Sequence, residues 1–430
     1  MKYPALQVAL DFIDLSRAEK CAKEAVLGGC DILEAGTPLI KSEGLDCVRK
    51  LRKLFPEKTI VADMKIMDAG RTEVESAAKA GADIVCVLAA AADETIKECV
   101  KAGKNYGAQI QADLIAIKDP VKRAKQLEDL GVDIIGVHCA IDEQMHAKDA
   151  FKTLKEIIAV VDLPVAVAGG INSETAVSAV KAGASIIIVG GAITKEKNAT
   201  QAVKTIKKTI KSKKGTKTSL YKRVSEKNIK DILRKVSSAN VSDAMHRKEA
   251  VIGLKAIGKP IKIIGKVITV KTLPGDWAKP VQAVDKAEKG DVIIIDACGT
   301  GPAVWGELAT HSAKQKGIAG VIINGAARDI EEIIKMGLPV YSKMVMPNAG
   351  EPKGFGEIGV GLNIDGIVIE TGDWVVCDSD GICVIPQNSI VEVANRAMSV
   401  LETENRLRKE IDDGSTLSRV THLLKWEKTG

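Results

Sequence analysis

The sequence predicts an α/β protein in which an N-terminal (β/α)8 TIM barrel precedes a mixed α/β domain. First, a chain of 430 residues exceeds the usual ceiling for a single hydrophobic core. Second, up to about residue 210, short apolar runs alternate with amphipathic stretches at a period of roughly 25 residues. Third, this rhythm changes after a lysine-rich segment. We therefore expect a barrel over residues 1–210, a linker over 211–224 and a second domain over 225–430.

Eight apolar runs in the first region predict eight parallel strands. The segments between the runs are helix-like, and several end in a glycine before a polar residue, as in GGCD, AGAD and LGVD. Glycine there suits a left-handed helix C-cap. Strands that alternate with helices pair in parallel, and eight units favour a closed barrel over the alternative, an open doubly wound sheet. The expected strands are 5–11, 31–36, 59–66, 83–90, 108–116, 133–140, 164–171 and 185–193.

The second region has a different pattern. KSKKGTKTS (211–219) has the composition of a linker, and a helical opening is expected over 225–238. Val- and Ile-rich strands separated by Gly and Pro turns follow, and a polar, charged helix is expected over 388–411. The tail after that helix closes the chain.

Composition excludes several classes of protein. Aromatic residues make up only 3% of the chain, which argues against base-stacking surfaces. No apolar run approaches the roughly 20 residues of a membrane span, and the N-terminus lacks a signal-peptide pattern. None of the nine cysteines makes a CxxC pair, so we expect no zinc or redox motif. We expect a cytoplasmic protein.

The stretch VADMKIMD (61–68) places three charged residues in and just after an expected core strand. Alternation puts Asp63 and Lys65 on one face of that strand, toward the barrel interior. Buried charges need partners, a metal or a ligand, and the open carboxyl end of a barrel is where such chemistry occurs. Asp68 follows on the loop.

Other strand ends carry polar residues too. Asp11 follows strand 1, Glu34 lies in strand 2, Asp113 lies late in strand 5 and His138 ends strand 6. One such residue is often a helix cap or a satisfied polar group, but several at successive strand ends predict one site. Glu34 and Asp63 could hold Mg²⁺, or another divalent cation such as Mn²⁺, through carboxylate oxygens.

Two glycine pairs end strands 7 and 8: Gly169 with Gly170, and Gly190 with Gly191. Backbone amides in such loops converge on anions, and phosphate usually docks there in TIM barrels. The substrate is therefore expected to be phosphorylated.

With these residues, the first 210 positions resemble the orotidine-5'-phosphate decarboxylase suprafamily. Glu34 and His138 together resemble its Mg²⁺-dependent branch, which contains 3-keto-L-gulonate-6-phosphate decarboxylase and 3-hexulose-6-phosphate synthase. Asp113, Ile141 and Ala168 stand where the decarboxylases carry Glu, Arg and Thr. Loss of that arginine favours the synthase reading, and the decarboxylase remains the alternative.

The resemblance implies a reversible aldol reaction in which D-ribulose 5-phosphate and formaldehyde give D-arabino-hex-3-ulose 6-phosphate. It implies that Mg²⁺ on Glu34 and Asp63, with the Lys65 ammonium, stabilises a 1,2-enediolate, and that His138 moves the C1 proton. Asp113 would orient substrate hydroxyls or a water, and Asp11 would bind a hydroxyl. Asp68 of one barrel would reach the site of its partner, which implies a homodimer.

The second region resembles the family of ribonuclease-E activity regulator A and 4-hydroxy-4-methyl-2-oxoglutarate aldolase, over about 225–390. Glu307 precedes the pair Arg328-Asp329 at the spacing found in enzymatic members. The resemblance implies that Asp329, with Glu307, serves a divalent metal and that Arg328 binds the oxo-acid end of a substrate.

The alternative is a binding module for a ribonuclease, helped by the Lys-rich 201–235 segment. The retained acidic residue and Arg-Asp pair argue against a ribonuclease or nucleic-acid partner. Oligomers larger than a dimer, built through the second domain, are compatible with this family.

Overall fold

The computed structural model describes residues 4–139, 151–218, 220, 228–248, 250–421 and 423. The chain divides into two compact units, which we describe separately. Residues 1–223 and 402–430 form the barrel unit, and residues 224–401 form the second unit. Ile141 and parts of the expected linker and of the expected helix over 225–238 lie outside the described residues.

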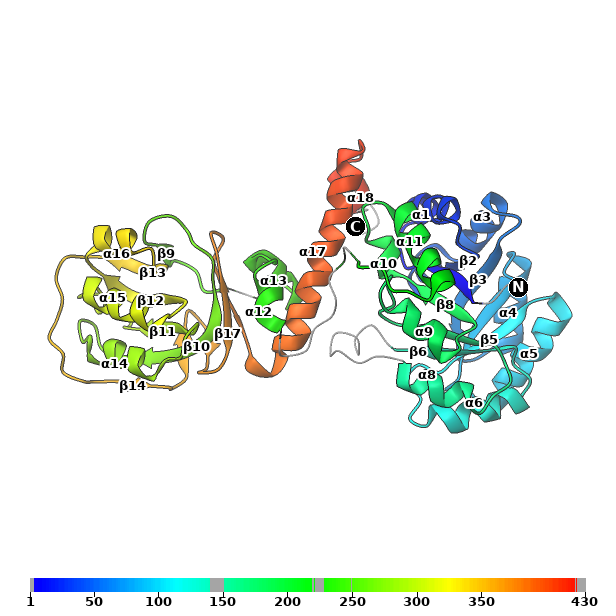
Figure 1. The fold of residues 1–430 in the computed structure, drawn as a ribbon, viewed down its shortest axis with the longest axis horizontal. Coiled ribbons are helices and arrows are strands. Elements are labelled where there is room, and N and C mark those ends of the chain that lie inside the picture. The colour runs from blue at the N-terminus through cyan, green and yellow to red at the C-terminus, as the bar shows by residue number, and fades with distance from the viewer. Residues whose placement is uncertain are drawn as a thin grey trace, which may run out of the picture. The chain divides into compact units, whose positions relative to one another are not determined.

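Eight parallel strands close into a barrel, as predicted, and helices surround them (Figure 1). The strands are β1 (Ala5–Leu10), β2 (Ile32–Ala35), β3 (Thr59–Ile66), β4 (Ile84–Leu88), β5 (Gln109–Asp113), β6 (Ile134–His138), β7 (Val165–Ala168) and β8 (Ile186–Val189). Each strand pairs with the next one in the sequence, and β8 pairs with β1.

The barrel helices follow the strands in order. They are α1 (Leu15–Gly28), α2 (Thr37–Glu43), α3 (Asp46–Leu54), α4 (Gly70–Lys79), α5 (Asp93–Tyr106), α6 (Pro120–Asp129), α8 (Phe151–Ile158), α9 (Ala176–Ala182), α10 (Gly191–Thr194) and α11 (Ala199–Ser212). Gly29 and Gly183 cap α1 and α9 with φ of 90° and 98°, the left-handed conformation that glycine adopts without strain.

Apolar residues close one end of the barrel interior. Ala5, Ile32, Ile84, Ile134 and Ile186, each near the start of a strand, belong to one buried cluster. A larger core fills the layer between the strands and the helices. The charged side chains inside the barrel lie toward the carboxyl ends of the strands, where the candidate site lies.

The second unit is an open mixed sheet. Its strands are β9 (Lys255–Ala256), β10 (Ile263–Lys271), β11 (Val292–Asp296), β12 (Gly320–Ala327), β13 (Val340–Val345), β14 (Glu357–Ile358), β15 (Leu362–Ile364), β16 (Ile367–Ile369), β17 (Trp374–Cys377) and β18 (Ile382–Ile385). The order in the main sheet is β18-β17-β10-β11-β12-β13-β9, and β10 to β13 run parallel.

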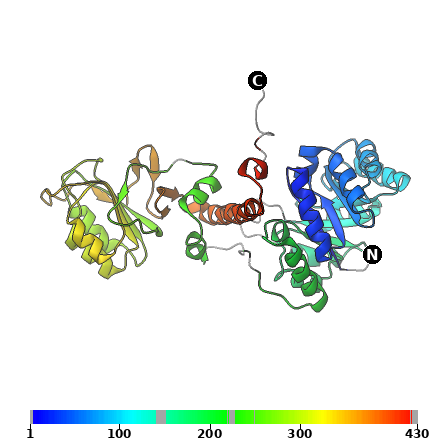
Figure 2. The same cartoon turned by 90° about the horizontal axis from the view of Figure 1, so that it is seen from above.

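Helices cover one face of this sheet. They are α14 (Ala278–Lys286), α15 (Glu307–Lys316) and α16 (Ile330–Met336), seen together in yellow and yellow-green in Figure 2. Their apolar residues share a buried cluster with Ile293 and Ile323 of the central strands. The alternate residues Ile294 and Ile322 pack with β15 to β18 on the other face. The short helices α12 (Ile229–Leu233) and α13 (Ser238–Ala244) open the unit.

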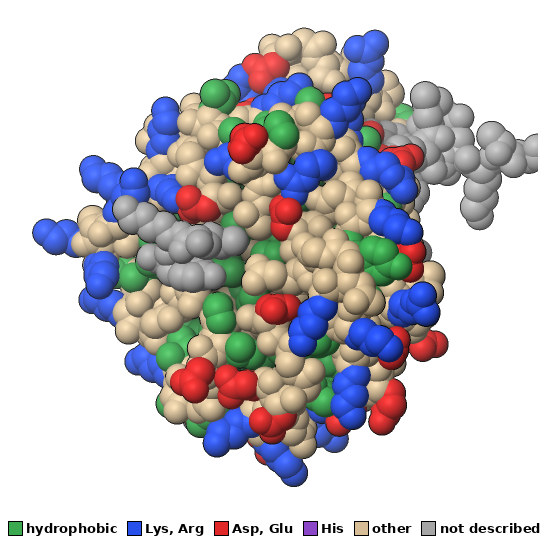
Figure 3. Space-filling view, turned by 90° about the vertical axis from the view of Figure 1, so that its right-hand side faces the viewer, with side chains coloured by type: hydrophobic (Ala, Val, Ile, Leu, Met, Phe, Trp, Pro, Cys, Tyr) green, Lys and Arg blue, Asp and Glu red, His purple; other side chains and the backbone are tan. Residues whose placement is uncertain are grey.

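The last helices of the described residues are α17 (Ile390–Asp412) and α18 (Leu417–Val420). From Glu402 onward these residues belong to the barrel unit, whereas the boundaries expected from the sequence place them with the second domain. None of the described helices is long and apolar enough to cross a membrane. Figure 3 shows basic and acidic side chains interspersed over one face of the molecule, without a continuous surface of one sign.

Candidate active site

The barrel contains a cavity of about 370 Å³ at the carboxyl ends of its strands. Every barrel residue predicted for the site lines this cavity except Asp68. These residues are Asp11, Glu34, Asp63, Lys65, Asp113, His138, Gly169, Gly170, Gly190 and Gly191. The side chain of Asp68 is exposed, and its Oδ1 accepts a hydrogen bond from the backbone amide of Ala69 at 2.7 Å.

Lys65 joins two carboxylates in the cavity. Its Nζ lies 2.9 Å from Asp113 Oδ2 and 3.2 Å from Asp63 Oδ1. Burial alone would lower the pKa of Lys65, but the charges of Asp113 and Asp63 outweigh burial and raise it. The side chain therefore stays an ammonium.

The backbone at Lys65 is irregular. Its φ is 49°, and the pairing of β3 with β4 shifts register between Ala62 and Ile66. A left-handed non-glycine residue stores strain, which folds commonly retain where a side chain must be aimed at a site. The expectation that both Asp63 and Lys65 face the interior is confirmed, but through a bulge rather than through simple alternation.

Asp113 fixes the orientation of His138. Its Oδ2 lies 3.0 Å from His138 Nδ1, and its Oδ1 accepts from the amide of Ile115 at 2.9 Å. Burial would raise the pKa of Asp113, but the hydrogen bonds and charges of His138 and Lys65 outweigh burial and lower it to about 2. An ionised Asp113 can only accept, so His138 Nδ1 donates the proton, and Nε2 is the acceptor of the neutral imidazole.

Glu34 and Asp63 are buried carboxylates on neighbouring strands. Glu34 Oε2 accepts from Gln7 Nε2 at 2.8 Å, and Asp63 Oδ2 accepts from Thr37 Oγ1 at 2.7 Å. Burial, followed by the negative charges of Asp63 and Asp11, holds the pKa of Glu34 well above its ordinary value.

This donor set fits a small divalent cation, because such a cation would relieve the repulsion among Asp11, Glu34 and Asp63. Within the described ranges, no group of three or more His, Cys, Asp or Glu side chains is gathered as a metal site. Glu34 and Asp63 would thus supply the protein oxygens and leave the other positions to substrate and water. Mg²⁺ is commonly bound through only one or two carboxylates in this way.

The glycine loops approach the site closely. Gly169 has φ of 110°, and a Cβ there would lie 2.7 Å from the carbonyl oxygen of Cys139. A Cβ on Gly190 would lie 3.2 Å from Asp11 Oδ2, so the loops after β1 and β8 are neighbours. The loop after β2 is closer still, because a Cβ on Gly36 would lie 2.2 Å from Asp11 Oδ1. A larger residue at Gly36 or Gly169 would force a neighbouring atom to move, whereas at Gly190 a small shift of the Asp11 carboxylate would suffice.

Sequence reasoning missed three polar residues. Gln7 and Thr37 hold the carboxylates of Glu34 and Asp63. Gln111 lines the cavity, and its buried Oε1 has no hydrogen-bond partner among the described residues. The signal was present, since Gln7 and Gln111 are uncharged polar residues inside apolar strands, and Gln111 shares a face with Asp113.

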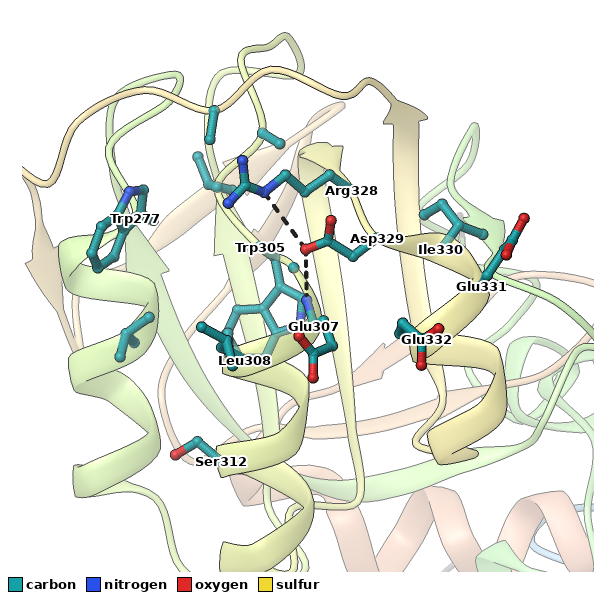
Figure 4. A pocket seen from close by; sticks show the side chains of 16 residues that line it. Trp277, Trp305, Glu307, Leu308, Ser312, Arg328, Asp329, Ile330, Glu331 and Glu332 are labelled. Atoms are coloured by element: carbon teal, nitrogen blue, oxygen red, sulfur yellow. Dashed lines mark hydrogen bonds and ion pairs between the residues drawn. The ribbon is translucent and has the colours of Figure 1, made fainter.

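The second unit has a larger cavity, of about 670 Å³, whose lining includes the predicted residues Glu307, Arg328 and Asp329 (Figure 4). Arg328 and Asp329 follow β12 directly, and Glu307 opens α15. Trp277 and Leu308 add apolar surface to the wall.

Asp329 sits at the N-terminus of α15. Its Oδ2 accepts from the backbone amide of Glu307 at 3.1 Å and lies 3.6 Å from Arg328 Nε. A Cβ on Gly306 would lie 2.6 Å from the same Oδ2, so glycine permits the approach. A carboxylate is favourable at a helix N-terminus. The contact uses the amide of Glu307 rather than its carboxylate, as the dashed lines of Figure 4 show, and a metal role for Glu307 and Asp329 stays a prediction.

Comparison with known families assigns both halves of the chain. Residues 4–206 match the model of the orotidine 5'-phosphate decarboxylase / HUMPS family, and residues 238–384 match the aldolase/RraA model. The resemblance of both regions, and their fusion, are thereby confirmed.

Individual relatives match the barrel half. The 3-hexulose-6-phosphate synthase of Bacillus subtilis is 39% identical over 206 residues, which are 48% of this chain and 98% of that protein. The protein of the same name from Mycobacterium gastri is 41% identical over 191 residues, 44% of this chain and 90% of that protein. The crystal structure of the Salmonella typhimurium 3-hexulose-6-phosphate synthase, 33% identical, covers 49% of this chain and 99% of its own, with a TM-score of 0.47.

Proposed function

Because the chain belongs to the orotidine 5'-phosphate decarboxylase / HUMPS family and continues into an aldolase/RraA domain, we propose that its barrel is an aldehyde-lyase of the 3-hexulose-6-phosphate synthase type. The reaction is the reversible addition of formaldehyde to D-ribulose 5-phosphate. The observation that carries the proposal is the Lys65 ammonium between Asp63 and Asp113, with His138 on the same Asp113 oxygen.

Each residue of the site then has a defined task. The amides of the loops at Gly169–Gly170 and Gly190–Gly191 bind the phosphate. Gln111, with a free buried acceptor, and Asp11 bind substrate hydroxyls. These contacts hold the sugar with C1 toward His138.

His138 acts as the base. With Nδ1–H donated to Asp113, its Nε2 accepts the proton from C1 of ribulose 5-phosphate. C1 then forms a bond to the formaldehyde carbon, and the formaldehyde oxygen takes up a proton. Lys65 stabilises the negative charge that develops on the substrate oxygens. A divalent cation on Glu34 and Asp63 would supply further positive charge to those oxygens.

The barrel proposal is tested by formaldehyde release from D-arabino-hex-3-ulose 6-phosphate. We expect release by the wild type, and loss of release after removal of divalent cations and in Asp63→Ala. Ala168 lines the cavity, where the gulonate decarboxylases carry Thr. Release of CO₂ from 3-keto-L-gulonate 6-phosphate, without release of formaldehyde, would instead assign the barrel to the alternative decarboxylase.

Asp68 remains the proposed link to a second barrel. Its side chain is exposed and does not line the cavity of its own barrel, which is what we expect of a residue that acts in the site of a partner. A homodimer is therefore part of the proposal. Sedimentation of wild type and of Asp68→Ala, together with formaldehyde release, tests it.

For the second unit we propose a lyase that acts on a small oxo acid. The cavity beside Arg328 and the N-terminus of α15 supports this proposal, because a guanidinium and backbone amides both bind carboxylates. Decarboxylation of oxaloacetate and retro-aldol cleavage of 4-hydroxy-4-methyl-2-oxoglutarate, each followed by pyruvate formation, are the assays. Stoichiometric binding of a ribonuclease without either activity would favour the non-catalytic alternative.

A further inference from the structure

The C-terminal part of α17 supplies the barrel with a buried arginine. Arg406 is 3% exposed, and its guanidinium contacts three separate segments of the barrel unit. Nη2 lies 3.2 and 3.1 Å from the two carboxylate oxygens of Glu24 on α1. Nε donates to Glu410 Oε1 at 3.0 Å. We call residues 402–412 the return segment, because they come back to the barrel unit after the second unit.

The third contact of Arg406 is with the backbone that follows strand β8. Nη1 donates to the carbonyl oxygen of Glu196 at 2.8 Å and lies 3.4 Å from that of Lys197. These carbonyls come directly after α10, the single turn that begins at Gly191. Arg406 therefore holds the backbone just beyond the turn whose start carries the proposed phosphate site.

Backbone hydrogen bonds link the two ends of this turn. The amide of Ile193 donates to the carbonyl of Gly190 at 2.8 Å, and the amide of Lys195 donates to that of Gly191 at 3.1 Å. The amide of Glu196 donates to the carbonyl of Ile193 at 3.2 Å. Gly190 is thus connected to Glu196 through Ile193 by backbone hydrogen bonds, which is the route by which a contact at Glu196 would influence the glycines.

The return segment reaches a second part of the site through Arg17. Glu410 Oε2 accepts from Arg17 Nε at 3.0 Å. The Arg17 guanidinium lies over the ring of Phe12 at 5.3 Å from its centroid, and Phe12 directly follows Asp11. Asp11 in turn adjoins Gly190 across the cavity mouth. The return segment therefore supports both loops that meet at Asp11 and Gly190.

We propose that Arg406 is a positioning residue for the phosphate subsite of the barrel. The proposal rests on the function proposed above, in which the loop at Gly190–Gly191 binds the substrate phosphate. A lysine at this position keeps a positive charge between Glu24 and Glu410. It lacks the planar guanidinium, which donates hydrogen bonds to carboxylates and to backbone carbonyls at the same time. Arg406→Lys should therefore fold and yet leave the loop less well fixed.

The test compares Arg406→Lys with Arg408→Lys in the full-length chain. Arg408 lies on the same helix and is 57% exposed at its side chain. Its partners among the described residues are neighbours on that helix, Glu404 at 2.7 Å and Asn405. For Arg406→Lys we expect the KM for hexulose 6-phosphate to rise about tenfold, because the loop that binds the phosphate is less well fixed before substrate binds, with kcat within about twofold. Arg408→Lys should match the wild type in both constants.

Two further measurements locate the effect. Competitive inhibition by inorganic phosphate should weaken in parallel with KM in Arg406→Lys, and calorimetric titration with ribulose 5-phosphate should show the same loss of affinity. The proposal would be overturned if Arg406→Lys had the same KM, the same phosphate inhibition and the same affinity as the wild type, even if its thermal stability were lower. A raised KM with unchanged phosphate inhibition would overturn it as well, because the effect would then lie elsewhere.

The calorimetric readout separates the two proposals. If the wild type binds ribulose 5-phosphate but releases no formaldehyde, the proposed reaction is wrong, and the affinities of the two variants still decide the role of Arg406. If formaldehyde is released and both variants bind equally, the reaction stands and the positioning role fails.

Discussion

Replacing Asp113 by asparagine tests the geometry of the barrel site most directly. Asp113 Oδ2 accepts hydrogen bonds from Lys65 Nζ, at 2.9 Å, and from His138 Nδ1, at 3.0 Å. Its Oδ1 accepts one from the backbone amide of Ile115. In Asp113→Asn the amide oxygen can keep the contact with Ile115. The NH₂ group then takes the place of Oδ2, and it cannot accept a hydrogen bond from the Lys65 ammonium or from the His138 ring.

The expected defect is in proton transfer. An asparagine NH₂ that donates to His138 Nδ1 places the ring proton on Nε2, so the nitrogen facing the substrate is no longer a base. General-base catalysis contributes about 10²- to 10⁴-fold, which corresponds to about 2.7–5.4 kcal/mol. We expect a loss of this size in the rate of proton abstraction.

The assay is exchange of the C1 proton of ribulose 5-phosphate in D₂O without formaldehyde, followed by NMR, because it isolates this step. The matched control is Asp119→Asn. Asp119 is an exposed N-cap of α6 whose side chain accepts from the amide of Lys122, and asparagine caps helices equally well. An exchange rate of Asp113→Asn within about threefold of the wild type would refute the assigned role of Asp113 and His138.

Three other predictions follow from close contacts. In Gly36→Ala the new Cβ would lie 2.2 Å from Asp11 Oδ1, so we expect the KM for hexulose 6-phosphate to rise at least about tenfold without loss of folded protein in thermal unfolding. Burial would raise the pKa of Asp276. Hydrogen bonds from the backbone amides of Ala278, Phe355 and their neighbours to its carboxylate outweigh burial, so the pKa is lowered. The carboxylate therefore adds stability above its unfolded pKa of about 3.9, and this stability is lost as pH falls through the lower folded value. Urea unfolding should show Asp276→Asn less stable by about 1–3 kcal/mol at pH 7, with a smaller difference at pH 3. Arg328→Met should reduce oxo-acid turnover about 10²-fold and leave formaldehyde release by the barrel unchanged, whereas equal loss of both activities would contradict two independent sites.

The architecture of the barrel was predictable because its signals are local. Each apolar run became a strand, and glycines such as Gly29 and Gly183 ended helices as expected. The charges of Asp63 and Lys65 pointed to the open end, because the starts of the strands carry apolar residues toward the interior. Gln7 and Gln111 were missed because a single uncharged polar side chain inside an apolar strand is a weaker signal than a charge.

The bulge at Lys65 shows a different limit. Asp63 and Lys65 both line the cavity, yet the left-handed backbone at Lys65 and the register shift against β4 are not a local preference of lysine. Strain of this kind is sustained by tertiary contacts, so the sequence around it carries no signal.

The burial of Arg406 could not be read from the sequence either. Along α17, the pairs Glu392–Arg396, Glu404–Arg408 and Arg406–Glu410 share the same four-residue spacing. Such spacing is typical of a solvated helix face. The side chain of Arg406 is nonetheless 4% exposed, whereas that of Arg408 is 57% exposed. Arg406 differs from Arg408 in its contacts with Glu24 on α1 and Glu196 after α10. These two partners lie some 200 to 380 positions away along the chain.

The place of the return segment in the chain has a consequence for biosynthesis. A ribosome finishes the eight strands of the barrel long before it adds Arg406, because the whole of the second unit is translated in between. At roughly 5–20 residues per second, the nascent barrel waits on the order of ten seconds or more with Glu24 lacking this guanidinium and with the carbonyls after α10 open to water. Nascent chains that stop within the second unit should therefore hold a barrel with all of its strands and an unsupported strand-8 loop.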